Sequence, residues 1–337
     1  LDEIQRVPEI FTAIKLAVDQ DRQPGRFLLI GATDMLLLPK LADSLAGRMD
    51  LLRLHPLAQV ELAGEDSNFL SVLFTKGFKA GTPGRRLGLS LEERVAAGGY
   101  PAALARATAR RRAAWYRDYI DTLVQRDVRD LARISALDAL PRLLALTAGQ
   151  TARLLNVTDL SAPFQLSRPT IRDYMTLLAR IFLLEELPPW HSNRLSRLIK
   201  TPKLHLGDTG LACALLGLDA AALWEDRALY GQLLETFVYQ ELRRQASWQE
   251  EPFAFHHFRD KDGDEVDVVL ESGGKLVGVE VKAAATVSST DFRGLRKLQG
   301  AVGTRFLAGV VLYDGDAVVP FGERLYAVPL SRLWEER

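Results

Sequence analysis

The sequence predicts a multidomain α/β protein with a helical middle region. Its 337 residues exceed what a single hydrophobic core ordinarily organises, so two or three domains are expected. Helix and strand patterns alternate over residues 1–64. Residues 206–337 contain, in order, a helix, three strands, a second helix and a further strand. An α/β domain at each end of the chain therefore encloses a region dominated by helices.

The composition is that of a globular protein without a strong overall charge. Apolar residues make up 47% of the chain, and 43 basic residues balance 43 acidic ones. Any attraction to nucleic acid must therefore come from a local patch. The single cysteine, Cys213, cannot form an internal disulfide, which fits a reducing compartment. No apolar run approaches the length of a transmembrane helix and no signal peptide is visible, so we expect a cytoplasmic protein that does not enter membranes.

Residues 1–64 are expected to form half of a doubly wound α/β domain. The segment "PEIFTAIKLAVDQ" has apolar residues at helical spacing. The segment "RFLLIGA" is short and continuously apolar, which is typical of a strand buried on both faces of a parallel sheet. A second helix is expected over "MLLLPKLADSLAG", with an irregularity at Pro39, and a second strand at the end of "RMDLLRLHPL".

Residues 65–140 are expected to be mostly helical. The loop "GFKAGTPGRRLG" is rich in glycine, but it lacks the Gly-Lys-Ser/Thr ending of a phosphate-binding loop and no strand precedes it. The stretch "RATARRRAAWYRDYIDTLVQRDVRDLARI" predicts one long helix, or two, crowded with arginine. Pairs of Arg and Asp on a solvated face explain this composition. A nucleic-acid groove is the alternative interpretation.

Residues 141–205 predict a winged helix-turn-helix. The segment "LSRPTIRDYMTLLARIFLLEELPPW" begins a helix with Ser167 as its N-cap and Pro169 in its first turn. The end of this segment reads as a β-ribbon, which completes the winged pattern. Arg168, Thr170 and Arg172 would lie at the front of a recognition helix, where contacts to DNA bases or phosphates are made. The alternative is a winged helix that docks on protein and does not touch DNA.

A pair of strands in the last domain carries the strongest chemical signal. In "GDEVDVVLESGGKLVGVEVKA", strand alternation places Val266 and Val268 on one face and Asp267 on the other. A two-residue Gly-Gly loop would pair Asp267 with Glu280, with their Cβ atoms about 5 Å apart. Carboxylates this close repel each other unless a cation or a proton intervenes. Mg²⁺ suits such hard oxygen ligands, and Lys282 on the same face can stabilise a developing phosphate charge or position water.

This hairpin resembles the core of the PD-(D/E)xK nuclease superfamily, and the order of elements agrees. The resemblance implies that Asp267 and Glu280 bind Mg²⁺ or Mn²⁺ and that Lys282 assists the hydrolytic water. It also implies a further metal ligand from the preceding helix, where Glu235 in "LLETFV" holds that place. An exposed acidic hairpin followed by a lysine would show the same letters without any chemistry.

The whole chain resembles a family of prokaryotic AAA-type P-loop ATPases with a C-terminal domain of unknown function. The segment "LDEIQRVPE" is similar to the Walker B segment of that family, whereas "GGYP", "RLIKTPKLHLGDTGLACALLG" and "GQLLETFVYQEL" are similar to its C-terminal domain. The resemblance implies that Asp2 is the acid associated with Mg²⁺ and that Glu3 is the catalytic acid of an ATP site. Arg48 in "AGRMD" matches an arginine that could reach a nucleotide phosphate.

The P-loop of this family lies upstream of the Walker B strand, and these 337 residues do not contain it. We therefore expect these residues by themselves to bind little ATP, although the resemblance implies ATP and Mg²⁺ as cofactors of the full-length protein. The sensor strand has Ile30, Gly31 and Ala32 where the family commonly has Thr-Gly-Ser, so two hydroxyls that could sense the γ-phosphate are missing.

These patterns predict an AAA-type ATPase-family protein with a DNA-binding winged helix and a nuclease-like C-terminal domain. Two alternatives stay open: a metal-dependent DNA endonuclease that needs no ATP, and a non-catalytic regulator that binds DNA or protein. DNA is the expected partner, and self-association is also considered. The expected domains are a partial P-loop α/β ATPase domain (1–64), a helical lid (65–140), a winged-helix-like domain (141–205) and a PD-(D/E)xK-like α/β domain (206–337).

Overall fold

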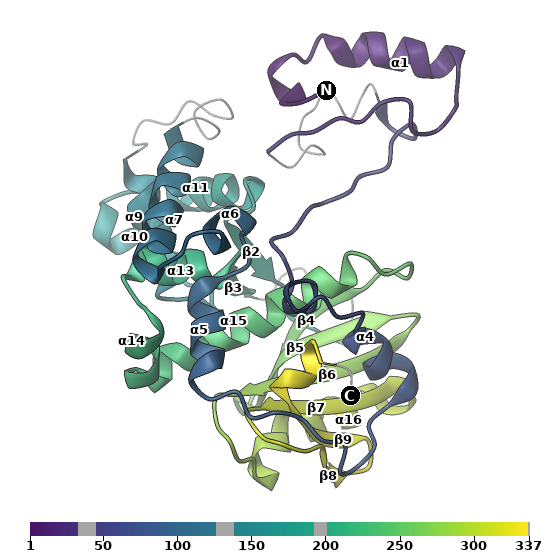
Figure 1. The fold of residues 1–337 in the computed structure, drawn as a ribbon, viewed down its shortest axis with the longest axis vertical. Helices are drawn as coiled ribbons and strands as arrows, with labels where there is room; N and C mark the ends of the chain where they lie inside the picture. Colours follow the sequence, from purple (N-terminus) through teal and green to yellow (C-terminus); the bar gives the residue numbers. More distant parts are fainter. Residues whose placement is uncertain (33–44, 126–137, 192–200, 336–337) are drawn as a thin grey trace.

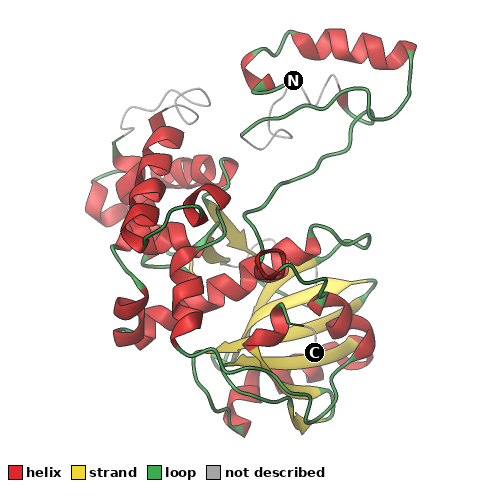
Figure 2. Ribbon diagram, viewed as in Figure 1, coloured by secondary structure: helices red, strands yellow, loops and turns green. Residues whose placement is uncertain are grey.

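The computed structural model describes residues 1–32, 45–125, 138–191 and 201–335. Figure 1 shows an N-terminal part around helix α1, a helical part, and a C-terminal part built on a large sheet. An extended segment joins the N-terminal part to the other two. Figure 2 shows that the strands are concentrated in the C-terminal part, whereas helices dominate the helical part. Among the residues just given, no helix is both long and apolar enough to cross a bilayer.

The N-terminal part has a small core of its own. Helix α1 (Ile10–Gln20) buries Phe11 and Ile14 against Ile4, as the helical spacing of its apolar residues predicts. The predicted helix over residues 35–47 lies mostly outside the described residues. The N-terminal core is therefore separate from the core of the rest of the molecule.

The two strands predicted in the N-terminal part do not form, so that prediction was wrong. Residues 26–32 and 48–57 have no regular strand. The amino group of Leu1 donates a hydrogen bond to Leu28 O (2.8 Å), and Leu1 O accepts one from Ile30 N (2.9 Å). Leu28 nevertheless stays 74% exposed. A strand of a parallel sheet needs neighbours on both sides, and an apolar run cannot by itself supply them.

The extended segment over residues 49–57 is anchored at two points. Arg53 Nη2 donates to Glu185 Oε1 at 2.6 Å. At the end of the segment, Leu57 N donates to Gly99 O at 2.8 Å. The connection to the N-terminal part is therefore tied to the helical part by side-chain and backbone contacts.

Short helices lead from this segment into the arginine-rich helix α7 (Ala109–Leu123). Helix α7 buries Tyr116 and Ile120, whereas Arg110 and Arg117 on its other side are exposed. The predicted continuation of this helix beyond residue 125 lies outside the described residues. The preceding elements are α3 (Gln59–Ala63), α4 (Phe69–Ser71), the π-helical turn η3 (Val72–Lys76), α5 (Leu89–Ala97) and α6 (Pro101–Leu104).

The next unit has the order helix, strand, helix, helix, strand, strand. Its elements are α9 (Ala139–Ala148), β1 (Arg153–Leu154), α10 (Val157–Ser161), α11 (Arg168–Arg180), β2 (Leu184–Leu187) and β3 (Lys203–Leu206). Its strands form an antiparallel sheet in the order β1-β3-β2. The Ser167 hydroxyl caps α11 by accepting a hydrogen bond from Thr170 N (3.2 Å), and Pro169 lies in the first turn, as predicted. The ribbon predicted over residues 182–190 is only half correct, because this segment supplies the single strand β2 and its partner β3 comes from residues 203–206.

Helix α15 (Arg227–Ala246) runs between the helical part and the C-terminal sheet (Figure 1). The sequence predicts an amphipathic helix with one apolar face, but polar residues such as Thr236, Gln240 and Glu241 are buried as well. This happens because α5 and α13 contact the helix in addition to strand β6. The two helices before α15 are α13 (Thr209–Leu216) and α14 (Ala220–Glu225).

The C-terminal sheet has six strands in the order β4-β5-β6-β7-β9-β8. The pairs β6–β7 and β7–β9 are parallel and the other pairs are antiparallel. From α15 onward the elements follow the predicted order α-β-β-β-α-β. Their bounds are β4 (Ala254–Arg259), β5 (Glu265–Ser272), β6 (Lys275–Lys282), α16 (Arg293–Val302), β7 (Phe306–Tyr313), β8 (Val319–Gly322) and β9 (Leu325–Pro329).

The sheet is covered on both faces. One face packs on α15 and on η3, and Val268 and Val279 belong to the same core as Phe69. The other face packs on α16, where a Cβ at Gly278 would lie 2.6 Å from Leu295 Cδ2. This close approach explains why β6 has a glycine in the middle of an otherwise apolar strand.

Candidate functional site

The β5–β6 hairpin has the register that its loop predicts. Gly273 and Gly274 have φ angles of 55° and 75°, which suits a two-residue hairpin loop. The paired residues run from Ser272 opposite Lys275 to Val268 opposite Val279. The hairpin therefore brings Asp267 and Glu280 to the same end of the two strands.

Strict alternation along β5 fails at Asp267, which corrects the sequence prediction. Val266 packs with α16 on one face of the sheet, whereas Val268 packs on the opposite face. The pairing of β5 with β4 also shifts register at this point. Asp267 consequently turns one carboxylate oxygen to the backbone of β6, where Oδ2 accepts a hydrogen bond from Val281 N (2.9 Å). A β-bulge of this kind re-aims a side chain.

Helix α15 supplies Glu235 to this site, in the place that the resemblance implies. The Glu235 carboxylate does not meet Asp267 directly, because Lys203 lies between them. Lys203 Nζ donates to Glu235 Oε1 at 2.7 Å and to Asp267 Oδ1 at 3.1 Å. Only 3% of the Lys203 side chain is exposed. No motif in the sequence points to this residue, although a lysine within the apolar strand "KLHL" is itself a signal of a buried charge partner.

Glu280 and Lys282 form the outer end of the site. Lys282 Nζ lies 3.1 Å from Glu280 Oε1 and 3.9 Å from Asp291 Oδ1. Among the described residues, the buried Glu280 Oε2 has no hydrogen-bond partner. Glu235, Asp267, Glu280 and Lys282 thus lie together, with Lys203 among them, and their roles in metal binding and hydrolysis stay predictions.

Burial and mutual repulsion raise the affinity of this site for protons. Burial, and then the charge of Asp267, raise the pKa values of Glu235 and Glu280 well above their usual range. Burial alone would lower the pKa of Lys203, but Asp267 and Glu235 outweigh it and raise that pKa. The lysine therefore stays charged, and the two glutamates keep protons more readily than free glutamates do.

This arrangement does not fit the predicted Mg²⁺ or Mn²⁺ ion. Among the described residues, no group of three or more Asp, Glu, His or Cys side chains is placed to hold a metal. Both carboxylate oxygens of Asp267 are engaged, one by Lys203 and one by Val281 N. Glu235 is also turned toward Lys203. A metal ion would have to displace this ammonium group before it could bridge the carboxylates.

Two buried histidines border Lys203 and stay neutral. Burial, and then the charge of Lys203, lower the pKa of His257 to about 4. The same causes lower the pKa of His205 well below its usual value. His257 Nε2 lies 3.2 Å from Thr201 O, and His205 Nδ1 lies 3.0 Å from Thr236 Oγ1. These contacts support a structural role for both rings.

The predicted ATP-site residues lie in the N-terminal part. Asp2 is exposed and its Oδ1 accepts a hydrogen bond from Glu3 N at 2.9 Å. Glu3 has a left-handed backbone, with φ at 49°. Arg48 binds Asp19 through two hydrogen bonds of 2.7 and 3.1 Å. The roles of Asp2, Glu3 and Arg48 in nucleotide chemistry stay predictions.

The predicted DNA-contacting residues lie together on α11. Arg168 and Arg172 are exposed, and Thr170 is half-buried. The opposite side of the helix buries Ile171 and Leu178 in the core. The first turn of α11 therefore carries exposed arginines, whereas the inner face of the helix is packed in the core.

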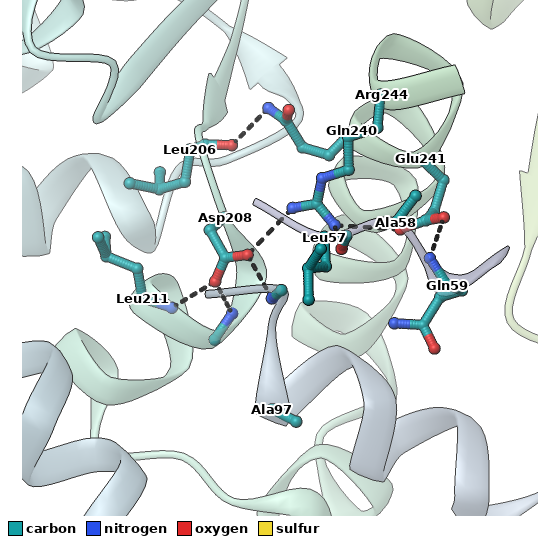
Figure 3. A network of polar contacts seen from close by, with 12 residues as sticks. Leu57, Ala58, Gln59, Ala97, Leu206, Asp208, Leu211, Gln240, Glu241 and Arg244 are labelled. Carbon is teal, nitrogen blue, oxygen red and sulfur yellow. Dashed lines mark hydrogen bonds and ion pairs between the residues drawn. The ribbon is translucent and has the colours of Figure 1, made fainter. Parts of the chain in front are cut away.

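Sequence reasoning also missed a buried polar network centred on Asp208 (Figure 3). Asp208 Oδ2 accepts hydrogen bonds from Gly99 N (2.8 Å) and Arg244 Nη2 (3.1 Å). Arg244 in turn donates to Leu57 O (2.9 Å) and to Glu241 (3.1 Å). The motifs "GGYP" and "GDTGLA" were visible in the sequence, and this network is where they meet.

Comparison with known proteins supports the ATPase part of the sequence prediction. A family model described as AAA domain matches residues 1–63, and models of two domains of unknown function, DUF8612 and DUF4143, match residues 88–222 and 230–333. The uncharacterized proteins Rv2008c of Mycobacterium tuberculosis and Mb2031c of Mycobacterium bovis are 28% identical to the chain over 335 residues, which is 99% of this chain and 68% of each relative. No solved structure matches the chain significantly. The AAA and DUF4143 matches support an AAA-like ATPase family for this chain.

Proposed function

We propose that this AAA-like protein binds duplex DNA through helix α11 and that its C-terminal domain, nuclease-like in layout, serves as a non-catalytic scaffold. The observation that supports DNA binding most directly is the exposed first turn of α11. Arg168 and Arg172 project from it, one turn apart, while the other face of the helix is held in the core. Guanidinium groups in this arrangement suit phosphate and base contacts.

The surrounding unit has the element order that a winged helix requires. Helix α11 is the third helix of a helix-strand-helix-helix-strand-strand unit whose sheet runs β1-β3-β2. In that arrangement the third helix is the recognition helix, which enters the major groove with its N-terminal residues leading. Because the whole chain is neutral, we expect affinity from this local patch, with weak sequence preference and strong salt dependence.

The test is fluorescence anisotropy of a labelled duplex at several salt concentrations. The double substitution Arg168→Ala and Arg172→Ala should weaken binding and lower the slope of log K against log salt by about 2, since two phosphate contacts are lost. The matched control is the double substitution Arg86→Ala and Arg293→Ala, which removes the same number of charges. These side chains lie away from α11 and are 66% and 69% exposed. Equal binding by the α11 variant and wild type at matched salt would reject α11 as the DNA-contacting helix.

The AAA match supports ATP and Mg²⁺ use in general. We assign Asp2 the role of the Mg²⁺-associated acid and Glu3 that of the catalytic acid, as the resemblance implies. Arg48 would contact a nucleotide phosphate only after leaving Asp19, to which it is bound here. Nucleotide binding would in this way compete with a contact that ties residue 48 to helix α1.

A metal-dependent nuclease, which would require Lys203 to leave the carboxylates, is the second candidate function. It is favoured by the buried Glu280 Oε2, which has no hydrogen-bond partner among the described residues, and by the adjacent Lys282. Plasmid nicking in Mn²⁺ that disappears in both Glu280→Ala and Lys282→Ala would support this function. The scaffold proposal expects intact plasmid with wild type and with both variants.

A further inference from the structure

The cation in the carboxylate site comes from outside the C-terminal sheet. Lys203 is the first residue of β3, which belongs to the small sheet with β1 and β2. Its ammonium group nevertheless lies 2.7 Å from Glu235 on α15 and 3.1 Å from Asp267 on β5. Three segments that are distant in sequence therefore meet at one buried ion cluster.

The charges of this cluster can be balanced by two lysines and a proton, without an added metal ion. Burying an ammonium group is costly unless carboxylates surround it, and burying carboxylates is costly unless a cation or a proton joins them. Lys203 contacts both carboxylates of the inner pair, Glu235 and Asp267, and offsets one of their two charges, whereas Lys282 faces Glu280 at the outer end. With two lysines against three carboxylates, one further proton completes the balance.

We propose that Lys203 is the resident cation of the carboxylate site: its ammonium group occupies the position from which a divalent metal would bridge Glu235 and Asp267, so the folded wild-type protein binds no divalent metal there. The proposal predicts that a neutral residue at position 203 turns the cluster into a metal site. Glu235 and Asp267, which Lys203 now contacts, would then be ligands, and Glu280 would have to turn toward them to supply the third, which completes a set of hard oxygens suited to Mn²⁺.

A second acidic cluster, in the C-terminal domain, also has a lysine ammonium group at its centre. Asp260, Asp262 and Asp264 lie in the turn between β4 and β5, and all three contact Lys297 from α16. The distances from Lys297 Nζ to Asp262 and Asp264 are 3.0 and 2.8 Å. The use of a lysine as the central cation thus occurs twice within this domain.

The experiment is a titration of the full chain with Mn²⁺ alone, followed by calorimetry and by thermal unfolding. Wild type should show no saturable Mn²⁺ site and no shift in Tm. Lys203→Gln, which keeps a polar side chain but removes the charge, should gain one Mn²⁺ per chain and a Tm that rises with metal concentration. Adding Glu280→Ala to this variant should abolish both effects. Lys275→Gln, on the exposed end of β6, is the matched control and should behave as wild type.

Two results would overturn the proposal. One is a saturable Mn²⁺ site in wild type that Glu280→Ala removes, because the resident lysine would then not exclude metal. The other is the absence of Mn²⁺ binding in Lys203→Gln and Lys203→Met when circular dichroism shows both to be folded. The wild-type titration decides the question even if neither variant folds, and none of these outcomes depends on whether α11 binds DNA.

Discussion

At the scale of single residues, Asp208 holds more segments together than any sequence pattern suggested. Its Oδ1 accepts hydrogen bonds from Gly210 N (2.9 Å), Leu211 N (3.1 Å) and the Tyr116 hydroxyl (3.0 Å). Its Oδ2 accepts hydrogen bonds from Gly99 N and Arg244 Nη2. One buried carboxylate thus caps helix α13 and ties α7, α15 and the turn after α5 to it.

We predict that Asp208→Ala is strongly destabilising. The substitution removes the acceptor of several buried donors, including Nη2 of Arg244, and leaves that guanidinium without one of its two carboxylate partners, so the free energy of unfolding should fall by about 3–5 kcal/mol. Urea denaturation followed by circular dichroism measures this loss. Asp219→Ala is the control, because Asp219 only caps α14 at the surface and its removal should cost about 1 kcal/mol. Similar costs for the two substitutions would contradict a central role for Asp208.

Lys203 is a residue whose role could not be predicted from a local sequence pattern, because its partners are distant in sequence. The spacing of Asp267, Glu280 and Lys282 on a hairpin is local, so the sequence predicts that these residues meet. Lys203 reaches Asp267 only because the small sheet lies beside the C-terminal sheet, where β2 contacts β4, and no sequence spacing encodes that contact. The sequence therefore indicated the acidic residues of this cluster but not Lys203, the lysine that lies between two of them.

At the scale of elements, helix α16 is fitted to the sheet through one of its glycines. A Cβ at Gly294 would lie 1.8 Å from Glu265 O, which belongs to the backbone of β5 and cannot rotate away. A Cβ at Gly300, on the same helix, meets nothing within 4 Å. A side chain at position 294 would therefore clash with β5, whereas one at position 300 would not.

The two alanine substitutions on α16 should have opposite signs. Gly294→Ala forces the helix away from β5 and should lower the free energy of unfolding by about 1–3 kcal/mol. Gly300→Ala removes backbone freedom without a clash and should raise it by about 0.5–1 kcal/mol. Chemical denaturation of both variants tests the pair. A neutral Gly294→Ala would show that α16 does not lie against β5 as described.

The elements that were predicted correctly are those whose signals are local. Ser167 and Pro169 mark the start of α11, and Gly273 and Gly274 close the β5–β6 hairpin, so each could be read from adjacent residues. The strand predicted over residues 26–32 failed for the opposite reason. A buried parallel strand is defined by its neighbours, and the described part of the chain does not enclose this segment between two of them.

At the scale of the whole molecule, buried neutral histidines make stability depend on pH. The pKa of His257 falls from about 6.5 when unfolded to about 4 when folded, mainly because the ring is buried. Between these values the unfolded state binds more protons, so stability rises with pH and is lost on acidification. The loss attributable to this ring is up to about 3 kcal/mol between pH 6.5 and pH 4.

The substitution His257→Gln isolates this contribution. The glutamine amide can still donate to Thr201 O but does not titrate, so the variant should lose less stability than wild type between pH 6.5 and pH 4. The difference in slope, measured by urea denaturation at several pH values, cancels the contributions of other groups such as His55, whose pKa is also lowered to about 4. Identical slopes would show that His257 titrates as a solvent-exposed histidine does.

The central claim is that the protein binds DNA through α11 without using a metal at its carboxylate site. The most direct measurement is one anisotropy titration of a labelled duplex with wild type, performed in EDTA and repeated in Mn²⁺, with the DNA then examined on a denaturing gel. We predict superimposable binding curves and intact strands in both conditions. Binding that requires Mn²⁺, or strand cleavage that Glu280→Ala abolishes, would contradict the account.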